Sequence, residues 1–400
     1  MKKSATIALV IIIGLVSLYF LEVSPEDPEL TDPEKLTEFS SRMIDFSFNS
    51  FFELAKEEEN LFVSPYSIHT AMTMAYRGAD GETAEETAEV LGLTDKEMDK
   101  ILEDSLDLKR YLEHFSSRNE LAIANSFFLR GDIPFLESYR RDGERYFEAE
   151  IGPLPETGEP INDWVYEKTR EKIEEIIDDG PIDEDVIAYL VNAIYFQGNW
   201  AEEFDPENTR TDTFQAPQGD VEVEMMENEA DYKYEINEEF QSVTLEYEDG
   251  DFLFHAFMPT EKTLPQFYED FSVDTFQDMK PNNKREVVLR MPKFTLEDEL
   301  ELVEVLQALG IQKAFNRNEA DFSKMVDTEA LGLNVFLSDV LHASFIEVDE
   351  EGTEAAAATA VEISLESMPM AIEFNRPFLF VIEEPKTETI LFMGQLVDPN

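Results

Sequence analysis

The 400-residue chain is predicted to fold as one α+β domain that runs from about residue 36 to residue 400. Apolar residues at the spacing of an amphipathic helix begin this region: Leu36, Phe39, Met43 and Phe46. Residues 189–196 form an apolar run broken only by Asn192, which is typical of a strand buried on both faces. Helical and strand patterns then intermix without a linker rich in Gly or Ser, so we expect a single domain.

The N-terminus has the composition of an export signal. Lys2 and Lys3 precede an apolar run at residues 5–21, which would span about 26 Å as a helix. The run lacks a small-residue cleavage site, so we favour an uncleaved signal anchor at residues 1–22 over a cleaved signal peptide. The two lysines would stay in the cytoplasm. The protein is then extracellular, either secreted or anchored to the outer face of the cytoplasmic membrane.

The next two segments follow from local chemistry. Residues 23–35 carry three prolines and many acids, and we expect an acidic, Pro-rich tether there. Farther along, Ser64 can cap a second helix, Pro65 fits its first turn, and Ile68 and Met72 would form its apolar stripe.

Composition places a large core inside a very acidic surface. Lys and Arg total 31 against 89 Asp and Glu, giving a net charge of −58, while 43% of residues are hydrophobic. Nucleic acids and anionic lipids are polyanions, so neither is an expected partner. Self-repulsion destabilises such a chain in dilute buffer, whereas molar salt shortens the screening length to about 3 Å. We therefore expect a halophilic source. The alternative, an acidic patch for a basic partner, is weaker because the acids are spread along the chain.

The sequence contains no assembled catalytic or metal site. Cysteine is absent, and the four histidines are scattered without ligand spacing: His69, His114, His255 and His342. Neither a Gly-rich phosphate loop nor a strand–nucleophile–helix serine motif is present. We expect neither an enzyme nor a cofactor.

Residues 353–366 carry the most informative pattern. Read at period two, one set is small or apolar: Thr353, Ala355, Ala357, Thr359, Val361, Ile363 and Leu365. The other set holds every charge, as in a strand with one buried face. Four consecutive alanines at 355–358 instead favour a helix. An exposed loop that can later enter a sheet reconciles the two. The alternative is a helical or flexible linker.

Several segments together resemble one family, the serpins. They occur in family order at 60–68, 77–79, 190–200, 291–294, 341–349, 374–382 and 390–399. The resemblance covers residues 36–400 and implies three β-sheets, eight or nine helices and an exposed reactive-centre loop. It also implies a monomer that inhibits serine proteases as a suicide substrate: the protease cleaves the loop and is acylated, and the loop inserts into the main sheet before hydrolysis.

The resemblance assigns roles along the loop. The hinge would comprise the residues Glu350, Glu351, Gly352, Thr353, Glu354, Ala355, Ala356, Ala357 and Ala358. Its small side chains favour an inhibitory member over a non-inhibitory serpin-fold protein used for binding or as a scaffold. Loop length places the reactive bond at Glu366–Ser367, which indicates a glutamyl endopeptidase as the target. One residue earlier, Leu365–Glu366 would fit a chymotrypsin-like or subtilisin-like protease.

The resemblance also implies two polar clusters. A shutter beneath the centre of the main sheet would comprise Ser64, Ser67, Asn192 and His342. A breach at the top of the sheet would place an ion pair between Lys293 and Glu350 near Trp200. Heparin-activated members carry a basic helix, but residues 83–113 here are dominated by acids, so we expect no glycosaminoglycan partner.

Overall fold

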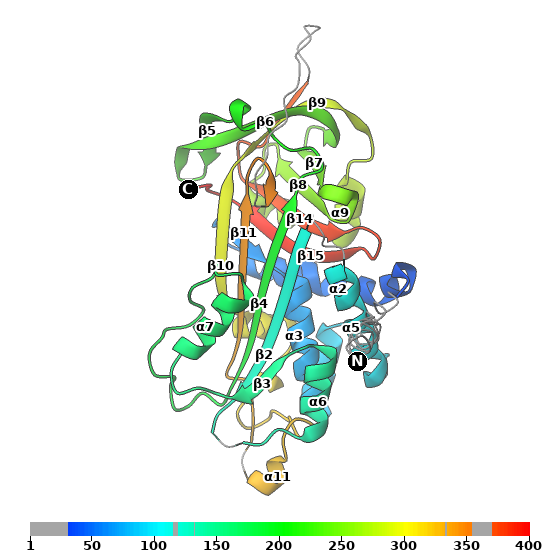
Figure 1. Ribbon diagram of the computed structural model, residues 1–400. Helices are drawn as coiled ribbons and strands as arrows, with labels where there is room; N and C mark the ends of the chain where they lie inside the picture. Colours follow the sequence, from blue (N-terminus) through cyan, green and yellow to red (C-terminus); the bar gives the residue numbers. More distant parts are fainter. Residues whose placement is uncertain (1–30, 115–118, 132, 333, 354–369) are drawn as a thin grey trace, which may run out of the picture.

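A computed structural model of the chain describes residues 31–114, 119–131, 133–332, 334–353 and 370–400. Two β-sheets run through the molecule, and helices cover them (Figure 1). The longer helices are α2 (Pro33–Leu54), α3 (Pro65–Gly78), α4 (Gly81–Val90), α5 (Met98–His114), α6 (Glu137–Tyr146) and α7 (Glu159–Lys168). The shorter ones are α8 (Leu264–Tyr268), α9 (Val273–Met279), α10 (Val303–Leu309) and α11 (Thr328–Leu331).

The main sheet has six strands, and it holds the predicted buried strand at its centre. Its order is β10-β11-β4-β2-β3, with β12 paired on β4. The strands are β2 (Asn119–Leu129), β3 (Glu150–Pro153), β4 (Ala188–Asn199), β10 (Phe294–Glu301), β11 (Asp339–Val348) and β12 (Gly352–Thr353). The central pair, β4 and β11, is parallel, whereas β12 runs antiparallel to β4.

The remaining strands form one nine-stranded sheet in the order β1-β15-β14-β8-β7-β6-β9-β13, with β5 on β6. They are β1 (Leu61–Val63), β5 (Arg210–Ala216), β6 (Gly219–Ile236), β7 (Phe240–Glu246), β8 (Leu253–Pro259), β9 (Lys284–Pro292), β13 (Ala371–Glu373), β14 (Phe378–Glu384) and β15 (Thr389–Leu396). The resemblance implied three sheets. Among the described strands two of these are joined, because the long strand β6 pairs with β5 and β9 along most of its length and with β7 at its end.

Both predicted helices form, and capping explains where they begin. Asp32 accepts a hydrogen bond from the Glu34 N–H, and Pro33 occupies the first turn of α2, so the helix begins ahead of Leu36. Residues 33–35, predicted to belong to the tether, are therefore helical. Ser64 caps α3 by accepting from the Ser67 N–H. No helix among residues that the structure describes is long and apolar enough to span a bilayer, and the apolar run at 5–21 lies outside them.

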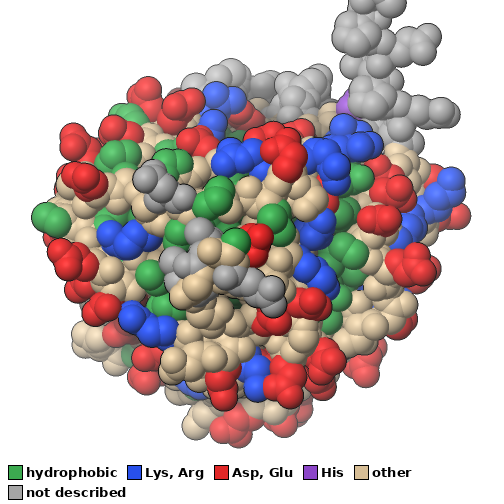
Figure 2. Space-filling model, turned by 90° about the horizontal axis from the view of Figure 1, so that it is seen from below, with side chains coloured by type: hydrophobic (Ala, Val, Ile, Leu, Met, Phe, Trp, Pro, Cys, Tyr) green, Lys and Arg blue, Asp and Glu red, His purple; other side chains and the backbone are tan. Residues whose placement is uncertain are grey.

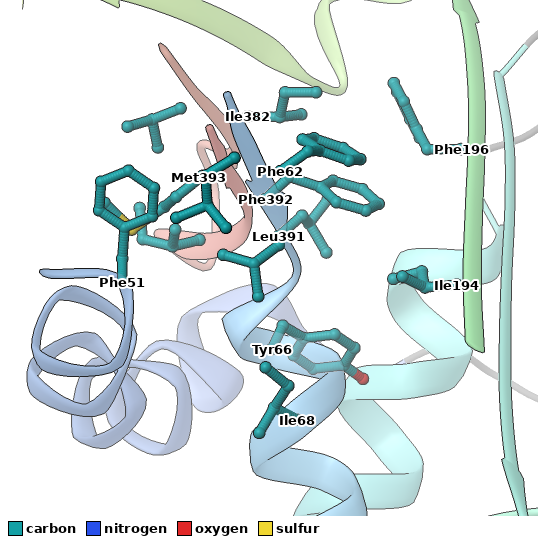
Figure 3. Packing of buried hydrophobic residues seen from close by; sticks show 14 of the residues in the cluster. Phe51, Phe62, Tyr66, Ile68, Ile194, Phe196, Ile382, Leu391, Phe392 and Met393 are labelled. Atoms are coloured by element: carbon teal, nitrogen blue, oxygen red, sulfur yellow. The ribbon is translucent and has the colours of Figure 1, made fainter. Parts of the chain in front are cut away.

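Aromatic stacking fills the core between the two sheets. Phe62 on β1 stacks on Phe392 on β15 with ring centroids 5.0 Å apart, and Phe392 approaches Phe196 on β4 at 5.8 Å. Figure 3 shows these rings above Tyr66 and Ile68 of α3. The back of the main sheet therefore rests on α3 and the second sheet.

A second, smaller apolar cluster covers the front of the main sheet. Helix α7 contributes Ile161, Trp164 and Val165, which pack against residues on the face of β4 and β11 that points away from the second sheet. Figure 2 shows Asp and Glu side chains around much of the edge of one face, with Lys and Arg between them. The acids are thus not confined to a single patch on this face.

Candidate functional site

The candidate site is the junction between β4 and β11, together with the segment that enters it. The two strands pair in register from Tyr189 opposite Asp339 to Tyr195 opposite Phe345. Beyond that pair their hydrogen bonding stops. β12 then pairs with the far end of β4, with Gly352 opposite Asn199. The chain that leads into the predicted loop is therefore already seated at the open end of the junction.

The predicted shutter residues come together beneath this junction. Asn192 and His342 are directly opposite in register, and Asn192 Oδ1 lies 2.6 Å from His342 Nδ1. Asn192 Nδ2 donates to Ser67 Oγ at 2.6 Å, and Ser64 Oγ donates to the Leu391 carbonyl at 2.6 Å. All four predicted residues are buried. The cluster was predicted only as a group of polar residues at matching positions, and the structure joins it into one hydrogen-bonded network.

The hydrogen bonds fix the tautomer of His342. The backbone N–H of Ser64 donates to His342 Nε2 at 3.2 Å, so Nε2 must be the unprotonated nitrogen. Nδ1 therefore carries the hydrogen and donates it to Asn192 Oδ1 across the junction. Burial lowers the pKa of His342 to about 3, which keeps the ring neutral.

The network includes a residue that the sequence analysis did not predict. Asn125 on β2 accepts a hydrogen bond from Asn192 Nδ2 at 2.9 Å, and the two residues are opposite in register. Asn125 is buried within an otherwise largely apolar strand, the same signal that marked Asn192. That signal could have identified it.

The predicted breach is also assembled. Lys293 Nζ lies 2.7 Å from Glu350 Oε2, and Thr209 Oγ1 donates to Glu350 Oε1 at 2.6 Å. Glu350 is only 7% exposed, so the acidic partner of this ion pair is buried. Burial alone would raise the pKa of Glu350, but the hydrogen bonds from Lys293 and Thr209 outweigh it, and the pKa is lowered. Thr209 was not predicted.

Trp200 holds the hinge through its backbone and its ring. Its N–H donates to the Glu351 carbonyl at 2.9 Å, and its indole Nε1 donates to the Asp349 carbonyl at 3.1 Å. The ring stacks on Tyr247 with centroids 4.5 Å apart. The hinge therefore begins from a fixed anchor.

Gly352 turns the chain from this anchor onto β4. Its φ of +145° is unfavourable for any residue with a side chain. A Cβ there would lie 2.2 Å from the Gly198 carbonyl oxygen. Glycine is thus required at the point where the hinge meets the sheet.

Most of the predicted loop falls outside the part of the chain that the structure describes. Hinge residues 354–358 and both candidate reactive bonds, Glu366–Ser367 and Leu365–Glu366, belong to that undescribed part. At the far end of the loop, β13 pairs in parallel with β9, with Ile372 opposite Leu289. Among the described residues no group of His, Cys, Asp or Glu has the arrangement of a metal site.

Comparisons with known proteins identify the family. The sequence model of the serpins (serine protease inhibitors) matches residues 41–399. The chain belongs to the serpin family. An uncharacterized serpin-like protein of Methanosarcina acetivorans is 32% identical, over 89% of this chain and 85% of that protein. Serpin B6 of Pongo abelii is 35% identical, over 88% of this chain and 97% of its own length.

Solved serpin structures have the same fold. The native state of the thermophilic serpin tengpin superposes with a TM-score of 0.81 at 27% identity, covering 93% of this chain and 96% of tengpin. Human thyroxine-binding globulin, solved with thyroxine, gives 0.82 at 29% identity, covering 91% and 99%. The serpin fold predicted from the sequence is confirmed. The solved structures with this fold thus include a protein named as a serpin and a protein named for binding thyroxine.

Proposed function

We propose that this serpin inhibits a serine protease as a suicide substrate. One observation carries the proposal: Gly352 and Thr353 are already paired on β4 at the point where the β4–β11 pairing has ended. A strand that continued from Thr353 along β4 would have to pass between β4 and β11. The hinge therefore leads directly to the position that loop insertion requires.

The sheet geometry makes this insertion favourable. β4 and β11 are parallel to each other, and β12 is antiparallel to β4. A strand that extended β12 between them would replace one parallel pairing with two antiparallel ones. Antiparallel pairing is slightly more stable per residue. Insertion also adds a strand's worth of backbone hydrogen bonds to the centre of the sheet.

The insertion has to break specific contacts. The bond between His342 Nδ1 and Asn192 Oδ1 crosses the junction, as do the backbone bonds from Tyr189–Asp339 to Tyr195–Phe345. Buried donors and acceptors need partners. Asn192 would keep the bonds from its Nδ2 to Ser67 and Asn125, whereas its Oδ1 and the His342 Nδ1–H would need new partners once the strands part.

The target follows from the loop sequence. Cleavage at Glu366–Ser367 would serve a glutamyl endopeptidase, and cleavage at Leu365–Glu366 a subtilisin-like or chymotrypsin-like enzyme. In either case the protease serine is acylated by the residue before the broken bond, and insertion of the loop carries the acyl-enzyme away before water completes the reaction. We propose that the inhibitor acts outside the cell, where a signal anchor at residues 1–22 holds it to the membrane, and that it works in concentrated salt.

A second function is a binding or scaffold role without inhibition. The structural match to human thyroxine-binding globulin, at a TM-score of 0.82, supports this second function, because that protein has the same fold and is named for binding a small molecule. The two functions differ in what happens after loop cleavage. An inhibitor traps the protease covalently, whereas a binding protein is only cut or is left intact.

The deciding experiment is a trapping assay in molar salt. The soluble part of the chain is mixed with a glutamyl endopeptidase and, separately, with subtilisin. An SDS-stable band near the summed mass supports inhibition, and mass spectrometry of the released peptide distinguishes Glu366 from Leu365. Clean cleavage without a covalent band for either enzyme would contradict the proposal and favour the binding role.

A further inference from the structure

Helix α7 and the turn that follows it lie over the front of the β4–β11 junction. Trp164 and Val165 of α7 pack in the same apolar cluster as Ala193 on β4 and Phe345 on β11. Figure 1 shows α7 in front of the main sheet. Any strand that enters the junction therefore has to pass beneath this layer.

The turn after α7 has an unusual backbone. The N–H of Glu171 donates to the Tyr166 carbonyl at 2.8 Å, which closes the helix in the manner of a Schellman cap. Such a cap needs one residue in the left-handed region, and glycine usually supplies it. Here Arg170 and Glu171 have φ values of +55° and +65°. Two non-glycine residues thus adopt the left-handed conformation, which is strained for any residue with a side chain. Strain of this kind is concentrated at functional positions in proteins.

The strained turn places two cationic side chains, Arg170 and Lys172, on opposite sides of the junction. Arg170 Nε donates to Glu120 Oε1 at 2.8 Å, and Glu120 belongs to β2, on the β4 side. Lys172 Nζ lies 3.8 Å from Glu347 Oε2 and 5.2 Å from the centroid of the Phe345 ring, both on β11. The turn therefore bridges the two halves of the sheet that have to separate.

The bridge is placed at the end of the pairing. Phe345 and Tyr195 are the last residues paired in register between β11 and β4. Phe345 lies under Lys172, and Glu120, the partner of Arg170, is paired with Gln197 on β4, two residues beyond Tyr195. Beyond this pair the junction is open and β12 is seated on β4. An entering loop meets the bridge at the first pair of residues that it must part.

We propose that Arg170 and Lys172 form a clamp over the mouth of the junction, and that release of this clamp limits the rate of loop insertion. The inference rests on the proposed inhibitory function. The two are positioning residues, since they act through β2 and β11 and touch neither the protease nor the reactive bond. Exposed ion pairs contribute little to global stability. An interaction lost when the junction opens slows opening by no more than it stabilises the closed sheet, so the clamp changes the rate of insertion by a modest factor.

The variant that tests the clamp combines Arg170→Gly with Lys172→Gln. Glycine suits the left-handed position of Arg170, so the cap is kept while the cation is lost. The matched control is Lys168→Gln, which removes a cation from the last residue of α7. Lys168 lies 3.8 Å from its neighbour Glu167, and this pair does not cross the junction.

Tryptophan fluorescence supplies the readout. The chain has two tryptophans, Trp164 on α7 and Trp200 at the anchor of the hinge, and both are kept because each lies beside the segments that move on insertion. The loop is cleaved by subtilisin at concentrations where the observed rate no longer depends on the protease. The fluorescence change is followed by stopped flow, and the melting temperature of each cleaved protein shows whether its loop has inserted.

We expect the double variant to insert about threefold to tenfold faster than the parent, and Lys168→Gln to insert at the parent rate. Raising KCl should accelerate the parent more than the double variant, because salt screens the clamp. Equal or slower insertion in the double variant would overturn the clamp, provided that cleavage raises the melting temperature of the parent. If cleavage does not raise it, the loop does not insert, and the inhibitory function and the clamp both fail.

Discussion

Asn192 and His342 lie opposite each other on β4 and β11, and the 2.6 Å contact between His342 Nδ1 and Asn192 Oδ1 is a side-chain hydrogen bond across the junction. The ring is held neutral in one tautomer, since the Ser64 N–H donates to its other nitrogen. The bond therefore stabilises the closed sheet, and its loss favours separation of the strands.

His342→Ala tests this bond. The change leaves the Ser64 N–H and Asn192 Oδ1 without their buried partner, and we expect the free energy of unfolding to fall by about 2–4 kcal/mol. Urea denaturation in molar salt measures the loss. Size-exclusion chromatography of the same samples should show oligomers on warming, because an open junction can accept a second chain's loop. The exposed His114→Ala is the control, and an equal loss there would contradict the prediction.

Asp298→Asn tests a partly buried carboxyl on β10. Burial raises the pKa of Asp298 to about 7, although its Oδ2 accepts the Phe62 N–H at 2.6 Å. The folded state holds this proton more tightly than the unfolded chain, so the wild-type protein loses stability as pH rises from about 4 to about 7. Asparagine keeps an acceptor without the charge.

We therefore expect Asp298→Asn to stabilise the protein by about 1–3 kcal/mol at pH 8, and to have little effect near pH 4. Denaturation midpoints measured across this range give the difference directly. The control is Asp278→Asn on the exposed face of α9. A gain that does not depend on pH would rule out titration of Asp298 as its cause.

Glu350→Ala tests the anchor of the hinge. The change removes the acceptor for Lys293 and Thr209, and we expect a loss of about 1–2 kcal/mol in the free energy of unfolding. The freed hinge should also insert spontaneously during incubation at moderate temperature. Trapping activity would then decline with time while the melting temperature rises. The exposed Glu203→Ala should leave both unchanged, and a stable trapping activity in Glu350→Ala would contradict this role.

The net charge of −58 predicts a strong dependence of stability on salt. Repulsion between carboxylates spread over the surface destabilises the compact state, and at molar salt the screening length is about 3 Å. We expect the melting temperature to rise steeply with KCl. Sucrose at matched osmolality is the control, since it does not screen charge. A melting temperature insensitive to KCl would contradict a working medium of concentrated salt.

Patterns within short stretches of sequence predicted individual helices and strands, because capping and apolar periodicity are set by neighbouring residues. The apolar run broken by Asn192 is β4, and Ser64 with Pro65 begins α3. Pairing between distant strands was not accessible from the sequence alone. Two features depend on which distant strands pair with each other. One is the long strand β6, which joins two of the expected sheets, and the other is the hydrogen bond between Asn192 and Asn125.

The same distinction applies to the site. Lys293 and Glu350 were paired by resemblance, and their side chains lie 2.7 Å apart in the structure. Thr209 was missed, because a lone threonine has no sequence signal of its own. The turn at Arg170 was missed for the same reason: an arginine in the position of a glycine cap is visible only from its backbone angles.

Thr353→Arg tests the direction of insertion. Thr353 is paired on β4 opposite Gly198, at the leading end of the segment that would enter the sheet. By strand alternation its side chain would turn toward the sheet interior on insertion, and burying an unpaired guanidinium there is costly. Insertion should therefore become slower than hydrolysis of the acyl-enzyme. We expect cleavage of the loop to continue while the SDS-stable complex disappears, so that the inhibitor becomes a substrate.

The matched control is Met370→Arg. Met370 is 57% exposed and lies beyond both candidate reactive bonds, on the side of the loop that does not insert. The control adds the same charge to the same loop, so it should change binding to the protease without preventing trapping. The two variants are compared by the ratio of covalent complex to cleaved inhibitor at fixed protease. Unchanged trapping by Thr353→Arg would refute insertion along β4, because no strand could then have carried that arginine into the sheet.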